Sequence, residues 1–128
     1  DELYVEDKVT DSITGNRHYH FWGSGAVEFE LEQTVENLKA GTYKYTISIM
    51  GGDGGTTDIY SYVKINGQVV ATSPLQITVY NEWHTAVIEN IEIAEGDVLI
   101  VGIYVKCGGS GNGAWGKIDD ALLNSITK

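Results

Sequence analysis

Apolar and polar residues alternate along much of the chain, which is the pattern of β-strands that bury one face. In the clearest run, Val27, Phe29 and Leu31 point one way while the intervening glutamates point the other. A turn over 37–41 follows, and the apolar residues of 43–49 then share a face against Lys, Thr and Ser. These two runs predict two strands separated by a turn.

The same reading extends to the rest of the chain. Asn66-Gly67 is a two-residue hairpin signal, and short runs at 38–40 and 94–95 do not extend into a periodic helix. Further strands are predicted near 59–65, 69–71, 77–80, 85–93, 98–105 and 117–126. Eight or nine short antiparallel strands predict one all-β domain over residues 1–128, a β-sandwich of the jelly-roll type.

Composition agrees with short strands and tight turns, since the chain has 16 Gly, one Pro and 42% hydrophobic residues. The apolar runs are far shorter than the roughly 20 residues of a membrane span, so we expect no membrane partner. Residues 1–7 are largely acidic, and any secretion signal is expected to have been removed or to lie upstream. We therefore expect a secreted, extracellular protein.

The charge pattern narrows the range of ligands. The formal net charge is −10, and the 18 acidic residues are spread along the chain. Phosphate binding needs clustered Lys and Arg, so we expect no nucleic-acid partner. Cys107 is the single cysteine, which excludes an internal disulfide. An uncharged ligand agrees best with this composition.

Aromatic residues supply the first candidate binding chemistry. Trp22, Trp83 and Trp115 lie in or beside predicted loops, and Trp115 stands between small residues near two glycines. The C–H face of a pyranose packs on such rings while its hydroxyls seek polar partners. A tryptophan that closes the end of a sandwich core is the alternative for each of the three.

A tyrosine pair gives a second candidate surface. Tyr60 and Tyr62 share a strand face with Lys64, about 7 Å apart, and could form a platform for sugar rings. Ordinary packing of tyrosine across a sheet is the alternative. The polar residues that we expect to flank this platform and bind hydroxyls are Asp53, Asp58 and Asn81, with Glu82 beside them.

Two adjacent carboxylates suggest a metal. Asp119 and Asp120 point to opposite faces of a strand, so they cannot flank one glycosidic bond as catalytic residues do. Ile118, Asp120 and Leu122 would share the inward face, where a carboxylate needs a cation or strong donors. Calcium suits this role, and its candidate ligands are Asp120 with Asp119, Glu2 or Glu6. A hydrogen-bonded structural aspartate is the alternative.

Three histidines define a rival hypothesis. His18 and His20 lie two residues apart, and with His84 they could hold a catalytic metal as in small cupin-like metalloenzymes. The acidic third ligand expected three or four residues after His20 is missing, because Gly23 and Ser24 stand there. No nucleophile, nucleotide or other catalytic motif is present, so we assign no catalytic residue.

Several motifs together resemble the carbohydrate-binding modules, of the family 61 type, that are attached to bacterial endo-β-1,4-galactanases. They are 29–35 (FELEQTV), 40–43 (AGTY), 50–53 (MGGD) with Tyr60 and Tyr62, and 113–122 (GAWGKIDDAL). The resemblance implies a jelly roll, a structural calcium ion and affinity for β-1,4-galactan. We therefore expect a non-catalytic module that targets an associated glycoside hydrolase to a plant polysaccharide. A cell-surface lectin domain has the same fold and chemistry.

Overall fold

The computed structural model describes residues 2–7, 17–109 and 113–126, and for residues 2–7, 17, 18 and 120 it describes the backbone without the side chain. The described residues form nine strands. The strands are β1 (Glu2–Asp7), β2 (Arg17–Trp22), β3 (Val27–Val35), β4 (Gly41–Gly52), β5 (Thr57–Ile65), β6 (Gln68–Leu75), β7 (His84–Ile93), β8 (Leu99–Cys107) and β9 (Trp115–Ile126). The described residues include no helix with the length and apolarity that crossing a membrane requires.

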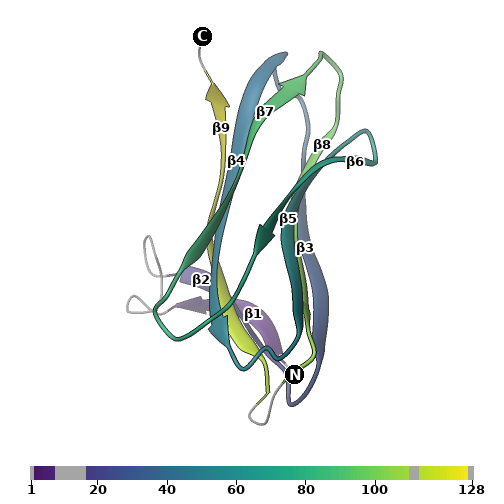
Figure 1. Cartoon of the computed structure of the whole chain (residues 1–128). Coiled ribbons are helices and arrows are strands. Elements are labelled where there is room, and N and C mark those ends of the chain that lie inside the picture. The colour runs from purple at the N-terminus through teal and green to yellow at the C-terminus, as the bar shows by residue number, and fades with distance from the viewer. Residues whose placement is uncertain (1, 8–16, 110–112, 127–128) are drawn as a thin grey trace.

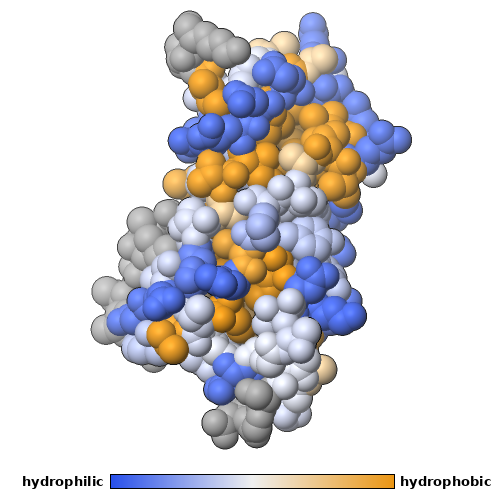
Figure 2. Space-filling view, in the orientation of Figure 1, coloured by the Kyte–Doolittle hydropathy of each residue, from blue (hydrophilic) through white to orange (hydrophobic). Residues whose placement is uncertain are grey.

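The strands pair antiparallel into two sheets that face each other, which confirms the predicted β-sandwich (Figure 1). Sheet A has the order β1-β2-β9-β4-β7, and sheet B has the order β3-β8-β5-β6. The edge strands β6 and β7 approach each other on one open side of the sandwich (Figure 1). Figure 2, in the same orientation, shows hydrophobic residues in this opening and on the β5–β6 hairpin, where Val69 and Val70 are exposed.

The alternating residues of the sequence build the core between the sheets. On β4 the apolar positions from Tyr43 to Ile49 are buried, and on β8 the corresponding positions run from Leu99 to Cys107. The hydroxyl of Tyr45 donates to the carbonyl oxygen of Gly102 in the other sheet, over 3.2 Å. Burial raises the pKa of Tyr45, so the phenol stays a neutral donor inside the core.

Three expectations about strands need correction. The strand predicted at 77–80 is wrong, because these residues belong to the 76–83 loop that carries the chain from β6 in sheet B to β7 in sheet A. The strands β1 and β2 were not predicted. Leu122 does not share the inward face of Ile118: the pairing of β9 with β4 shifts by one residue between Thr46 and Ser48, and Leu122 is 46% exposed.

Candidate functional site

Two tryptophans are neighbours on the outer face of sheet A. Trp22 of β2 and Trp115 of β9 are direct cross-strand partners, and Gly52 of β4 pairs with Trp115 on its other side. Cross-strand partners have Cβ atoms about 5 Å apart on the same face. Phe21 is fully buried in the core, so Trp22, the next residue, points outward.

Trp115 is held in a defined orientation. A Cβ atom added to Gly52 would lie 3.1 Å from the indole atoms, so the ring lies across this glycine. Its Nε1 donates a hydrogen bond to Oδ2 of Asp53 over 3.2 Å. Asp53 has a φ of 54°, a left-handed conformation that aspartate tolerates better than most residues. The end of β4 therefore supplies both the surface under the ring and the acceptor at its edge.

The 76–83 loop completes the cluster from a third direction. The Tyr80 and Trp115 rings lie with centroids 6.3 Å apart at an interplanar angle of 41°. The backbone N–H of Asn81 donates to the sulfur of Met50, which is fully buried on the outer face of sheet A. We call Trp22, Trp115, Tyr80, Asp53 and Asn81 the tryptophan platform. Its members come from β2, β9, the 76–83 loop and the end of β4.

Next to the platform, a charged residue is buried in the sheet surface. Lys117 pairs with His20 on one side and with Met50 on the other, and it is 5% exposed. Its Nζ lies 3.0 Å from Nδ1 of His20, which accepts in the neutral imidazole. Sequence reasoning missed Lys117 and Tyr80, although the spacing of Lys117 two residues after Trp115 could have placed it on the same face.

A polar triad fixes the 76–83 loop. Thr78 Oγ1 donates to Oε1 of Glu82 over 2.6 Å and lies 3.0 Å from Nε2 of His84. The Glu82 carboxylate is also 3.3 Å from His84 Nε2. These contacts close the loop on itself on either side of Tyr80 and Asn81. Glu82 was expected to bind sugar hydroxyls, but in the structure its carboxylate holds the loop through Thr78 and His84.

The structure does not bring the predicted tyrosine pair to the tryptophans. Tyr60, Tyr62 and Asp58 lie on β5, on the outer face of sheet B and therefore on the other side of the core. Tyr62 is 3% exposed, and its hydroxyl donates to Oε2 of Glu32 over 2.6 Å. This hydrogen bond lowers the pKa of Glu32, and burial together with the carboxylate raises the pKa of Tyr62. Asp53 and Asn81 lie beside the tryptophans instead.

Trp83 is half-buried and lies one residue before β7. No ring contact or side-chain hydrogen bond joins Trp83 to another residue of the described part of the chain. Trp83 belongs to the same loop as Tyr80 and Asn81. The described contacts of the platform are nevertheless made by Trp115, Tyr80 and Asn81.

His20 and His84 are not brought together into a metal site. His20 lies on the outer face of β2, and two strands separate β2 from β7, where His84 begins the strand. Three strand spacings amount to about 14 Å. His84 pairs with Ile49, a core-facing position, and is engaged with Thr78 and Glu82. The side chain of His18 lies outside the described residues.

The predicted calcium ligands are mostly beyond the described side chains. Asp120, Glu2 and Glu6 are placed by their backbone only, and the described side chains contain no group of three or more potential ligands. The register sets Glu2 level with Trp115, about 16 Å along β9 from Asp120. Asp119 shares the outer face with Ser48. Glu6, paired with His18, lies closer to the level of the two aspartates.

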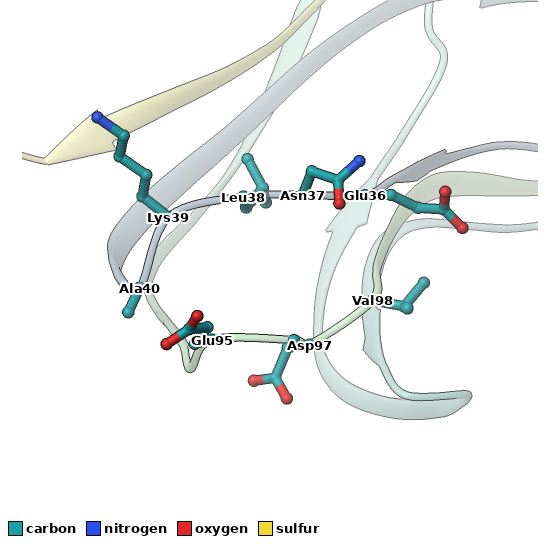
Figure 3. Close-up of a pocket in the computed structure, with 9 residues that line it drawn as sticks. Glu36, Asn37, Leu38, Lys39, Ala40, Glu95, Asp97 and Val98 are labelled. Atoms are coloured by element: carbon teal, nitrogen blue, oxygen red, sulfur yellow. The ribbon is translucent and has the colours of Figure 1, made fainter.

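A hollow of about 610 Å³ lies at the opposite end of the sandwich, between the β3–β4 and β7–β8 turns (Figure 3). Its described lining contains Glu36, Lys39, Glu95 and Asp97 but no aromatic ring. The Asp97 carboxylate accepts from the Ala94 N–H and from the Asn66 amide, and these bonds lower its pKa. Asp97 therefore stabilises the β7–β8 turn, and the described lining of this hollow offers no ring on which a sugar could stack.

Comparison with known proteins identifies similar folds. No protein-family model and no curated protein matches the chain by sequence. Among solved structures, it is similar to TmCBM61 in complex with β-1,4-galactotriose, with TM-score 0.82 and 27% identity over 97% of this chain and 82% of that chain. The fold is also similar to the EclA C-terminal domain, a sugar-binding protein (TM-score 0.52, 21% identity, 80% and 79% covered). The fold is similar as well to Family 16 Carbohydrate Binding Module-2, with TM-score 0.58 and 16% identity over 96% of this chain and 85% of that chain. The predicted resemblance is confirmed.

Proposed function

We propose that the chain is a carbohydrate-binding module of the family 61 type and that it binds β-1,4-galactan on the tryptophan platform. The observation that carries the proposal is the fixed indole of Trp115, which lies across Gly52 and is anchored to Asp53. An indole held in one orientation loses little freedom when a ligand stacks on it. The solved neighbour with galactotriose supports galactan as the chain that stacks there.

The platform has the chemistry that a neutral sugar needs. The axial hydroxyl of β-galactose leaves one ring face as a continuous patch of C–H bonds, which packs on Trp22 or Trp115. The groups that would bind hydroxyls are the second oxygen of Asp53, whose Oδ2 accepts from the indole, and the side chain of Asn81, whose backbone N–H donates to Met50. Each such hydrogen bond replaces one to water, so its net contribution to the binding free energy is small. The apolar area that is buried by stacking contributes most of it.

The module binds without cleaving. Glycosidases place two carboxyl groups about 5–10 Å apart across the scissile bond. Asp53 is the carboxylate that the described platform presents, and it is held by Trp115. Glu82, the next acid in the 76–83 loop, is held by Thr78 and His84. Asp53 is thus the support of the indole, and Glu82 is the support of the loop.

Binding without cleavage suits a targeting role. A module that holds an associated glycoside hydrolase on its polysaccharide raises the local concentration of enzyme near the substrate. Because galactan is a plant cell-wall polymer, the module would work outside the cell that makes it. A structural calcium ion, held by Asp120 and Glu6, is part of this proposal, and no step of binding depends on it.

Affinity electrophoresis tests the proposal. The protein is run in gels that contain β-1,4-galactan, cellulose derivatives or xylan, with and without a calcium chelator. We expect retardation in galactan alone, at the same ligand concentration for each polymer. Equal retardation by cellulose would remove the galactan assignment, while migration unchanged by all polymers would remove the binding function.

A further inference from the structure

A hollow lined in part by aromatic rings lies on the outer face of sheet B, across the core from the tryptophan platform. It has a volume of about 310 Å³. Its lining residues come from β3, β5 and β6, and they are Glu30, Tyr60, Tyr62, Lys64, Val69 and Thr72. Strand alternation places Tyr60, Tyr62 and Lys64 outward, because Ile59, Ser61 and Val63 are buried in the core.

A glycine creates this hollow. Gly102 of β8 pairs with Tyr62 on one side and with Glu32 on the other. A Cβ atom at Gly102 would lie 2.6 Å from Cζ of Tyr62, so the tyrosine ring occupies the space where a side chain would stand. The Tyr62 hydroxyl reaches across to Glu32. Tyr62 thus becomes the floor of the hollow, and Lys64 lies above its ring at 5.2 Å from the centroid.

Tyr60 is the aromatic ring that remains partly exposed at this floor. Its centroid lies 6.2 Å from that of Tyr62 and 5.1 Å from that of Tyr104 on the neighbouring strand. Tyr104 in turn donates a hydrogen bond of 2.5 Å to Oε2 of Glu28. The ring of Tyr60 is therefore supported on two sides by rings whose own hydroxyls are anchored. Such a preorganised surface costs little entropy to bind.

The charges around the hollow restrict its ligand. Glu28, Glu30 and Glu32 follow one another along the outer face of β3, and Asp58 stands on the same face of β5. Among the described residues, the cations on this face of β5 and β8 are Lys64 and Lys106. An acidic rim repels uronates and phosphates. Carboxylates with a spare lone pair accept hydroxyl donors, and a neutral sugar offers these together with a C–H face for Tyr60.

We propose that this hollow is a second binding site for a neutral glycan chain, on the sheet opposite the tryptophan platform. The proposal stands on sheet B alone and goes beyond the proposed function of the platform. Because the two sites face away from each other, they cannot share one short ligand. One module would instead hold two polysaccharide chains and link them.

The test is a titration with two neutral probes, β-1,4-galactotriose and cellotriose, followed by the amide resonances of both sheets. Four proteins are compared: wild type, Trp115→Ala, Tyr60→Ala and the double variant. Thr72→Arg is a fifth variant, which fills the hollow from β6 while leaving every tyrosine in the sequence, and it replaces Tyr60→Ala in the comparison if that variant disturbs the fold. Hexalysine is titrated as a control for a basic peptide ligand.

We expect saturable shifts on sheet B in Trp115→Ala that disappear in the double variant and in Thr72→Arg. Wild type should also increase light scattering by a galactan solution, and each single variant should abolish the increase. The absence of sheet B shifts with both probes overturns the proposal, as does binding of hexalysine in place of either sugar. If Tyr60→Ala abolishes all binding while Trp115→Ala changes none, this site stands and the platform assignment fails.

Discussion

Nε1 of Trp115 donates a hydrogen bond to Oδ2 of Asp53 over 3.2 Å, and this bond joins the first residue of β9 to the residue that follows β4. The two strands are paired within sheet A, so Trp115 lies on a paired strand and Asp53 directly follows one. The indole therefore has one orientation before any ligand arrives. The remaining Asp53 oxygen is left beside the ring, at the edge where the hydroxyls of a stacked sugar would lie.

Gly52→Ala should weaken galactan binding and leave the fold intact. The new methyl would lie 3.1 Å from the indole, which is tighter than ordinary contact, so Trp115 must move outward and away from Asp53. We expect a several-fold lower affinity by calorimetry. Gly25→Ala is the matched control, since a Cβ there meets nothing within 4 Å. Equal affinities for the two variants would show that the position of the indole does not matter.

Tyr62→Ala should unfold the domain more easily and leave binding at the platform unchanged. Tyr62 is 3% exposed, and removing a buried aromatic side chain costs about 3–5 kcal/mol of unfolding free energy. Tyr62→Phe keeps the ring and loses the bond to Glu32, at a cost of about 1 kcal/mol. Urea denaturation measures both. A stable Tyr62→Ala protein would mean that the ring is not packed as described.

Glu32 makes stability depend on pH in a defined direction. The hydrogen bond from Tyr62, and then the Lys64 charge, lower the pKa of Glu32 below its ordinary 4.5 in the folded state. A lowered folded pKa stabilises the fold above the ordinary value, and this contribution is lost as pH falls through the folded pKa. Near neutral pH, the melting temperature of wild type should therefore be higher than that of Glu32→Gln. The difference should vanish in acid, and a difference that grows in acid would contradict the assignment.

Calcium removal gives a further prediction. An ion bound only by the folded state stabilises it by mass action. If Asp120 and Glu6 hold calcium, a chelator should lower the melting temperature of wild type and leave that of Asp120→Ala unaffected. Asp119→Ala, a change at the neighbouring outer-face position, is the control and should stay sensitive to the chelator. Identical melting curves of wild type with and without chelator would mean that no stabilising calcium is bound.

The strands of the core could be predicted because burial on one face imposes a period of two on the sequence. This held for β4 and β8, whose alternate residues are buried in the core, and for β3, where Val27, Phe29 and Leu31 pack against it. The 77–80 segment has the same local pattern but forms a loop, because Ile77 packs against Gly51 and Gly54 while Tyr80 turns outward. Whether an apolar residue belongs to a strand is decided there by contacts distant in sequence.

The sequence could predict which face of a strand a candidate residue occupies, but not which of these residues lie together in space. Alternation correctly placed Tyr60 and Tyr62 on one outward face, yet the burial of Tyr62 follows from Gly102, which lies 40 positions later. The neighbourhood of Trp22 and Trp115 depends on the pairing of β2 with β9, from opposite ends of the chain. A one-residue shift between Thr46 and Ser48 likewise turned Leu122 outward. Register of this kind is not encoded in local periodicity.

The most direct test of the account is the affinity of Trp115→Ala for β-1,4-galactan, measured by calorimetry beside wild type and Tyr60→Ala. Loss of a stacked aromatic ring typically costs about 1–3 kcal/mol, which is roughly 5- to 150-fold in affinity. We predict that Trp115→Ala loses affinity for galactan within this range. Tyr60 lies on the opposite sheet, so Tyr60→Ala should keep the wild-type affinity at the platform. A folded Trp115→Ala protein that binds galactan as tightly as wild type would contradict the account.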